Sequence, residues 1–294
     1  MTNKFLKIFG LPIIALIAFI PATKTSFAQS ANQESGNFYI SKVLAKEVDA
    51  ESLDLNARKK VLIEILETSQ SEIEGLKNKL VGLNLDNNWQ KIRGRILDEL
   101  SRSQAYYQFY ENKINEGNIN LEEIKQLAAD LKDWREKNYT QKLLEATNMI
   151  LIFKDEGLLK VARERIDKIS ADIKKLDKQN IIKTDVLKIY LSEADKNLTG
   201  ADDSKNKAKD LFFKTITEQI TTLPEQQLTV LTPENAKTGE NQSSEKTGEP
   251  AKKSLSPEEI QNSVRDFIKE SIKDLRSTYE NFLQMNDKIK EYIP

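Results

Sequence analysis

The residues with the clearest capacity for chemistry lie close together and carry oxygen atoms that could bind a cation. They are Asp195, Asn197, Thr199 and Asp203. Their spacing follows that of a calcium-binding loop between two helices, and Gly200 stands where such a loop turns sharply. The pattern fails at its end, because Asn206 replaces the glutamate that binds calcium with both oxygens. The sequence therefore favours an ordinary turn between helices at 184–198 and 203–222, with weak calcium binding as the alternative.

A second candidate is a group of aromatic residues on one helical face, with a lysine beside them. The group consists of Tyr106, Phe109, Tyr110 and Lys113. An exposed group of this kind could stack on a sugar ring or dock a peptide. Aromatic residues at helical spacing more often pack between helices, so packing is the favoured interpretation and a ligand or partner surface is the alternative.

The composition removes several kinds of catalytic and metal site. The chain has no histidine and no cysteine. It therefore lacks the commonest general base, thiol nucleophiles, serine–histidine–acid triads and the usual zinc ligands. Paired carboxylates and Ser–Lys dyads are open in principle, but no local pattern indicates either. We expect a protein that is not an enzyme and needs no cofactor, with calcium as the one metal considered and a carboxylate-based hydrolase as the exception.

The N-terminus has the three-part layout of a secretory signal peptide. Two lysines precede an apolar run over residues 8–20, and Ser26-Phe27-Ala28 forms a cleavage site of small residues around a larger one. The run is shorter than the roughly 20 residues that a membrane-spanning helix needs. We therefore predict that residues 1–28 are removed and that the mature protein is exported to the periplasm or the extracellular space of a bacterium. It would keep no stable membrane span, although a retained anchor is the alternative.

The charges of the chain nearly cancel. Lys and Arg number 45 and Asp and Glu number 46, for a formal net charge of −1. Such a balance gives no electrostatic attraction toward nucleic acid or an anionic membrane. No nucleic acid partner is therefore expected.

Apolar residues recur at intervals of three and four through residues 38–222, which predicts helices throughout this part. We expect an all-α fold, an irregular antiparallel helical bundle with long, coiled-coil-like helices, after a polar lead at 29–37. Helices are predicted at 38–50, 55–83, 88–116, 120–134, 184–198 and 203–222. The helix at 55–83 carries a seam of apolar residues with one polar break, at Ser69.

Local signals mark helix ends and the core. Gly117 is predicted to end a helix in the left-handed conformation, and Asn120 with Glu123 to form a capping box at the start of the next. The segment Met149–Phe153 is apolar on every face, so we place it at the centre of the core. Gly157, soon after it, is expected to kink or break the helix.

The composition changes after residue 222. Residues 223–255 combine prolines with many polar residues, which predicts a disordered linker. A long amphipathic helix at 256–294 follows, with Ser256 as its cap, Pro257 as its first residue and Glu259 as the capping-box partner. Its apolar stripe contains Ile260, Val264, Phe267, Leu275, Phe282, Met285 and Ile289. A stripe of that length must be covered, either by the preceding bundle or by another chain.

These observations favour an exported, non-enzymatic helical protein, a structural or protein-interaction module of the cell envelope or extracellular space. In this hypothesis the C-terminal helix mediates self-association or binds a protein partner. The alternative is a periplasmic binding or sensor module for a small ligand, a sugar or calcium.

Overall fold

The computed structural model describes residues 55–179, 183–222 and 256–291. The predicted signal peptide at 1–28, the polar lead at 29–37, the helix at 38–50 and the linker at 223–255 lie outside these residues. The described residues are helical throughout apart from short connections, and none of them forms a strand. The predicted all-α fold is therefore confirmed, including a long C-terminal helix.

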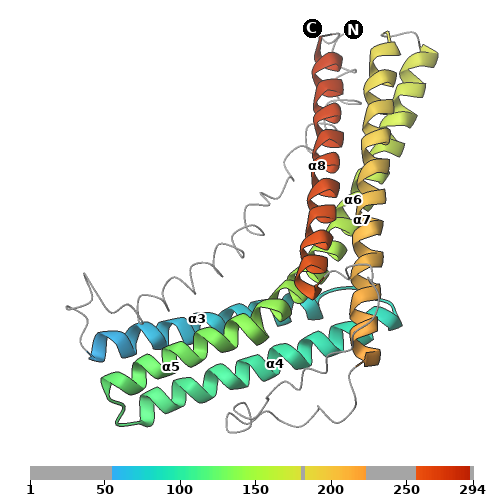
Figure 1. Ribbon diagram of the computed structural model, residues 1–294. Helices are drawn as coiled ribbons and strands as arrows, with labels where there is room; N and C mark the ends of the chain where they lie inside the picture. Colours follow the sequence, from blue (N-terminus) through green and yellow to red (C-terminus); the bar gives the residue numbers. More distant parts are fainter. Residues whose placement is uncertain (1–54, 180–182, 223–255, 292–294) are drawn as a thin grey trace.

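One arm of the molecule is built from helices that follow one another in the chain. Helix α3 spans Leu55–Val81, α4 spans Asn87–Glu116 and α5 spans Leu121–Trp134. A short π-helix, η3 at Arg135–Tyr139, joins α5 to the long helix α6 at Thr140–Gln179. Figure 1 shows α3, α4 and α5 lying side by side in this first arm.

A second arm projects at an angle from the first, so the described part of the molecule is bent and elongated (Figure 1). It contains the later half of α6, together with α7 at Asp185–Thr222 and α8 at Pro257–Lys290. Helices α7 and α8 run antiparallel, and the Thr278 hydroxyl of α8 donates to the Ala194 carbonyl of α7 at 3.3 Å. The C-terminal helix thus packs against α6 and α7 of its own chain, a choice that the sequence left open.

The predicted helix starts are confirmed in detail. Asn120 accepts from the backbone N–H of Glu123 at 3.0 Å, and the Glu123 carboxylate accepts from the Asn120 N–H at 2.8 Å. Ser256 and Glu259 form the same reciprocal pair at the start of α8, with Pro257 as its first residue. Each pair satisfies backbone donors that the first turn of a helix leaves without an intrahelical partner.

Glycine has other roles here than predicted. Gly117 is extended, with φ −88° and ψ 142°, so the predicted left-handed cap is wrong. A Cβ there would meet the Lys113 carbonyl oxygen at 2.6 Å and Ile119 Cγ1 at 2.9 Å, so close contacts require glycine. Gly157 lies within the single helix α6, so the predicted break there is wrong, and a kink at this position stays a prediction.

The core of the first arm follows the predicted apolar seam. Every predicted seam position of α3 from Leu62 to Leu80 is buried, including Ser69, and the aromatic and aliphatic residues of α4 pack against them. Met149, Ile150 and Ile152 are buried in the same cluster, which confirms the segment as core. This cluster also takes residues from the ends of α7 and α8, so it continues into the corner between the arms.

The core of the second arm uses smaller side chains. Ala194, Ala201 and Leu198 of α7 pack with Ala162 of α6 and Leu275 of α8, and all of them are buried. On α8, Val264, Leu275 and Met285 of the predicted stripe are buried. The other members, Ile260, Phe267, Phe282 and Ile289, are partly buried. The predicted stripe is therefore covered in large part by the chain itself.

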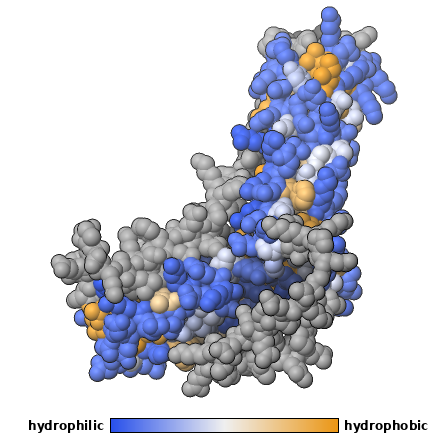
Figure 2. Space-filling model, in the orientation of Figure 1, coloured by the Kyte–Doolittle hydropathy of each residue, from blue (hydrophilic) through white to orange (hydrophobic). Residues whose placement is uncertain are grey.

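The described surface is mostly polar. On the face shown in Figure 2, hydrophobic residues form small, separate patches on a largely hydrophilic surface. Within the described ranges, no helix has the length and apolar character needed to cross a membrane.

Candidate functional site

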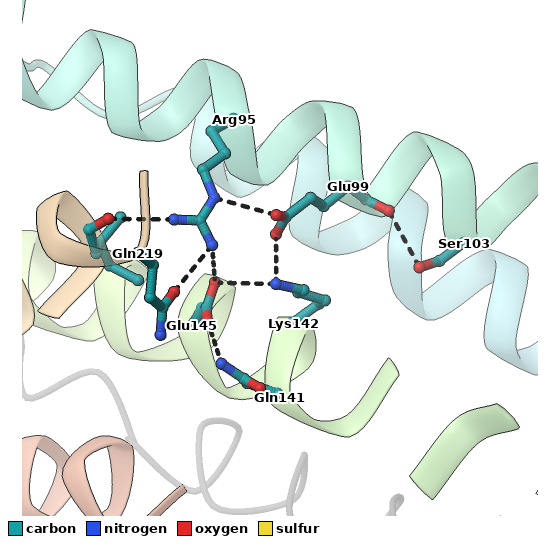
Figure 3. Close-up of polar contacts among 8 residues, drawn as sticks. Arg95, Glu99, Ser103, Gln141, Lys142, Glu145 and Gln219 are labelled. Atoms are coloured by element: carbon teal, nitrogen blue, oxygen red, sulfur yellow. Dashed lines mark hydrogen bonds and ion pairs between the residues drawn. The ribbon is translucent and has the colours of Figure 1, made fainter. Parts of the chain in front are cut away.

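A network of charged and polar side chains occupies the corner where the two arms meet (Figure 3). Arg95 of α4 donates to Glu99 at 3.0 Å, to the Ile216 carbonyl of α7 at 3.2 Å and to Gln219 of α7 at 3.0 Å. It also lies 3.5 Å from the Glu145 carboxylate of α6. One guanidinium therefore joins α4 of the first arm to the shared helix α6 and to the last turns of α7.

Glu145 is the buried centre of this network. Its side chain has no solvent exposure, and burial raises the pKa of its carboxyl group, while Lys142 and Arg95 act in the opposite direction. Gln141 donates to Glu145 at 2.9 Å, and Lys142 lies 3.1 Å from Glu99. Buried charges are retained only where they are paired and hydrogen-bonded, so these contacts hold the corner in one arrangement.

Aromatic packing reinforces the same corner. Trp89 of α4 lies over Phe212 of α7 at a centroid distance of 6.0 Å and meets Phe153 of α6 edge-on at 5.0 Å. The Lys209 ammonium lies 5.0 Å from the Phe153 ring centroid and also pairs with Glu156 at 3.0 Å. The angle between the arms is thus fixed by both apolar and polar contacts.

The predicted aromatic group forms part of a larger cluster in the first arm. Tyr106 of α4 stacks on Trp134 of α5 with ring centroids 3.9 Å apart, and Tyr110 lies 4.7 Å from Tyr106. Phe109 packs edge-on against Tyr110 at 5.6 Å while 44% of it stays exposed. Lys113 is exposed on the same helix. The structure therefore places the predicted residues close together but at different depths. Tyr110 is buried, whereas Phe109 and Lys113 lie at the surface.

A buried arginine lies beneath this cluster. Arg135 opens the π-helix, and its guanidinium donates to Ser69 Oγ at 2.6 Å and to the Tyr107 hydroxyl at 3.1 Å. It also lies 5.1 Å from the Tyr139 ring centroid. Ser69, the polar break in the α3 seam, thus supplies a hydrogen-bond acceptor for the buried guanidinium of Arg135. A π-turn adds a residue to the helix, which changes the face on which later side chains lie.

Glu72 of α3 lies next to this arginine. The Tyr139 hydroxyl donates to its carboxylate at 2.9 Å, and burial raises the pKa of Glu72 in spite of that bond and the Arg135 charge. Burial also raises the pKa of the Tyr106 and Tyr107 hydroxyls, so both groups are neutral at ordinary pH. The hydroxyl groups of the cluster are therefore neutral and held by fixed partners: the Tyr139 hydroxyl donates to Glu72, and the Tyr107 hydroxyl accepts from Arg135.

The predicted turn between two short helices is wrong. Residues 195–206 belong to the single helix α7, so Asp195 and Asp203 stand on a helix rather than in a loop. Asp195 pairs with Arg163 of α6 at 2.6 Å, and the Thr199 hydroxyl donates to the Asp195 carbonyl. A Cβ at Gly200 would lie 2.9 Å from a side-chain oxygen of Asp274 on α8, at the end of a side chain that can move aside.

The other residues of the calcium candidate, Asn197 and Asp203, lie on this helix as well. A calcium-binding loop needs a chain that curls around the ion, and a straight helix cannot supply it. In the described part of the chain, no three acidic residues gather in a way that could hold a metal ion.

Several buried polar residues were not found by sequence reasoning. Arg135, Glu145 and Asp155 are all buried, and each is a charged residue on a helix whose other buried positions are mainly apolar. A polar residue among buried apolar ones is the available signal, since Glu145 and Asn148 lie just before the apolar segment Met149–Phe153 of α6. Their partners come from other helices, and spacing within one helix does not identify them.

Comparison of the whole chain with models of protein families, with curated proteins and with solved structures gives no match in any of the three.

Proposed function

We propose that this protein is an exported, non-enzymatic helical protein that serves as a structural or protein-interaction module of the cell envelope or extracellular space. The observation that carries the proposal is Phe109, a large aromatic side chain 44% exposed on a rigid base. Its neighbour Tyr110 packs against Tyr106, and Tyr106 stacks on Trp134. Aromatic side chains fixed in this way are typical anchors of protein interfaces, because they bury large apolar area at little cost in conformational entropy.

The bent architecture supports the same proposal. The corner network around Arg95 and Glu145 holds the two arms at one angle, and α6 runs through both. A protein of this shape presents surfaces that lie far apart in a fixed relation, as a spacer or scaffold must. The N-terminal pattern at residues 1–28 supports export.

The C-terminal helix is not the main association surface in this proposal, although its apolar stripe suggested that role. Val264, Leu275 and Met285 pack against the protein's own helices. Self-association through these residues would require α8 to leave α6 and α7. We therefore place the main partner surface on α4, at Tyr106, Phe109 and Lys113.

Protein binding is favoured over sugar binding by the arrangement of the rings. Tyr106 and Trp134 are parallel within 9° and stack face to face, so one face of each ring is already covered and not available to a sugar. The exposed ring of Phe109 and the ammonium of Lys113 suit the apolar and acidic side chains of a protein partner.

The first test is the solution mass of residues 29–294 by size-exclusion chromatography with light scattering. A dimer that Phe109→Ala converts to monomer would identify the partner as a second copy of the chain. A monomer would direct the search to other proteins. In that case a photo-crosslinking amino acid at position 109, in the cells that export the protein, should give one discrete protein adduct.

The matched control is the same crosslinker at Val161, which is 42% exposed on α6 in the second arm. An adduct formed at 109, absent at 161 and lost in Tyr106→Ala supports the proposal. Equal adducts at both positions, or none at 109 in a folded, exported protein, would contradict it.

A further inference from the structure

A buried carboxyl group lies where α8 closes on the rest of the second arm. Asp155 of α6 is 2% exposed, and among the described residues neither of its oxygens accepts a hydrogen bond. The hydroxyl of Ser271 on α8 is also fully buried and lies close enough to Asp155 to lower its pKa, although in the described chain it makes no hydrogen bond of good geometry. Buried polar groups are nearly always paired, so two such groups facing each other across a helix interface are exceptional.

Two further charged groups face Asp155, both from α7. Lys205 is 7% exposed, and its ammonium lies 3.0 Å from Asp202 and donates to Asn206 at 2.7 Å. Burial has the largest effect on the pKa of Asp155 and raises it; the Ser271 hydroxyl and the Lys205 charge act in the opposite direction, and the Asp202 charge adds to the effect of burial. The ammonium is thus bound to other partners, and within the described helices only the Ser271 hydroxyl lies near the carboxyl group of Asp155 as a neutral polar group. The interior of the second arm is arranged for an uncharged Asp155.

We propose that the carboxyl group of Asp155 is a proton-operated latch for α8. When it is neutral, it can donate to Ser271 Oγ, and α8 closes on α6 and α7. When it is ionised, a charge without an adequate partner lies in the interface, and α8 separates more often. Opening exposes the carboxylate to water and relieves that cost.

The direction of the pH dependence follows from the ionisation of Asp155. Burial raises the pKa of Asp155 from its ordinary 3.8 to about 6 in the closed protein, and opening returns it toward the ordinary value. The closed form therefore binds the proton more tightly. The contribution of the Asp155 proton to the stability of the closed form is complete below the ordinary pKa of 3.8, and it is lost as the pH rises through about 6. Closure of α8 is accordingly strongest in mild acid and weakest at neutral pH.

Hydrogen exchange measured by mass spectrometry tests the latch on the full chain. After correction for the intrinsic exchange rate, the protection of peptides from α8 should fall about tenfold between pH 5 and pH 7. The Asp155→Asn variant has no ionisable side chain at position 155, so this fall in protection should disappear. At pH 7, α8 should be better protected in the variant than in the unsubstituted protein. Glu72→Gln, in the first arm, is the matched control and should leave the fall in place.

Each outcome decides the proposal. The same fall in Asp155→Asn as in the unsubstituted protein would overturn it, as would a fall of equal size in peptides of α3. If Asp155→Asn does not fold, carbon-detected NMR titration of the unsubstituted protein replaces it. A carboxyl group that titrates near pH 6 together with the amide signals of α8 supports the latch, and aspartate carboxyl groups that all titrate below pH 5 would disprove it.

Discussion

The two arms are both helical, yet they accommodate buried polar groups in opposite ways. In the first arm, the buried Arg135 has two hydroxyl acceptors and an aromatic ring beside it. In the second arm, the buried Asp155 has no hydrogen-bond partner among the described residues. The buried charge of Arg135 is thus satisfied by hydrogen bonds, whereas the buried carboxyl group of Asp155 has a cost that depends on its protonation.

The two arms also differ in the size of the side chains that fill their cores. Large side chains such as Leu76, Leu100 and Tyr107 fill the first arm. Alanines on α6 and α7, with Ser271 and Thr278 on α8, line the second. The first arm is also built from helices adjacent in sequence, while the second needs α8 to return after a long connection. We infer that the first arm is the more independent unit and that the second depends on one helix.

The largest expected effect comes from removing that helix. Deletion of residues 256–294 uncovers positions such as Leu198 and Ala201 that are fully buried in the intact chain. Helix α7 should then lose most of its protection in hydrogen exchange, and the helical signal in circular dichroism should fall, while α3 and α4 stay protected. Unchanged protection of α7 would show that the second arm does not depend on α8.

A cavity in the first arm should be nearly as costly. Leu76 is fully buried on α3, and Leu76→Ala should lower the free energy of unfolding by about 2–5 kcal/mol, since the cavity cannot fully collapse. Urea denaturation followed by circular dichroism measures this loss. Val81→Ala, on the same helix at 62% exposure, should change the free energy by less than about 0.5 kcal/mol. Similar losses in both variants would contradict the assigned core.

Enlarging a small buried residue should also lower the stability of the second arm, here by overpacking instead of by leaving a cavity. Ala201 is fully buried between helices, and Ala201→Leu should cost about 1–3 kcal/mol in the free energy of unfolding. Ala105→Leu places the same side chain at an exposed site of α4 and is the control. If both variants are equally stable in urea, the helices of the second arm are not closely packed.

The smallest effect is expected from Glu72 in the first arm. Burial raises the pKa of Glu72, but the Tyr139 hydroxyl and the Arg135 charge offset part of the cost. A raised pKa in the folded state means stability that is present at low pH and lost as the pH rises through that pKa. The unsubstituted protein should therefore lose stability relative to Glu72→Gln from pH 4 to pH 7. Denaturation midpoints that change in parallel would refute this assignment.

The sequence alone determined the features that depend on near neighbours along the chain. The capping boxes at Asn120 and Ser256 and the buried seam of α3 were predicted from spacing and are confirmed. Even the polar break at Ser69 was visible. Caps and seams are set by residues within a turn or two of one another, so local spacing is enough to find them.

Only the tertiary structure decided which faces meet. Arg135 as the partner of Ser69, the closure of α8 on its own chain and the continuous helix through Gly200 all depend on contacts between distant segments. Glycine near acidic residues favours a turn in an isolated chain, but the packing of α7 along α6 and α8 outweighs that local preference. The burial of Asp155 likewise arises only when three helices come together, which is why its ionisation has no signature in the sequence.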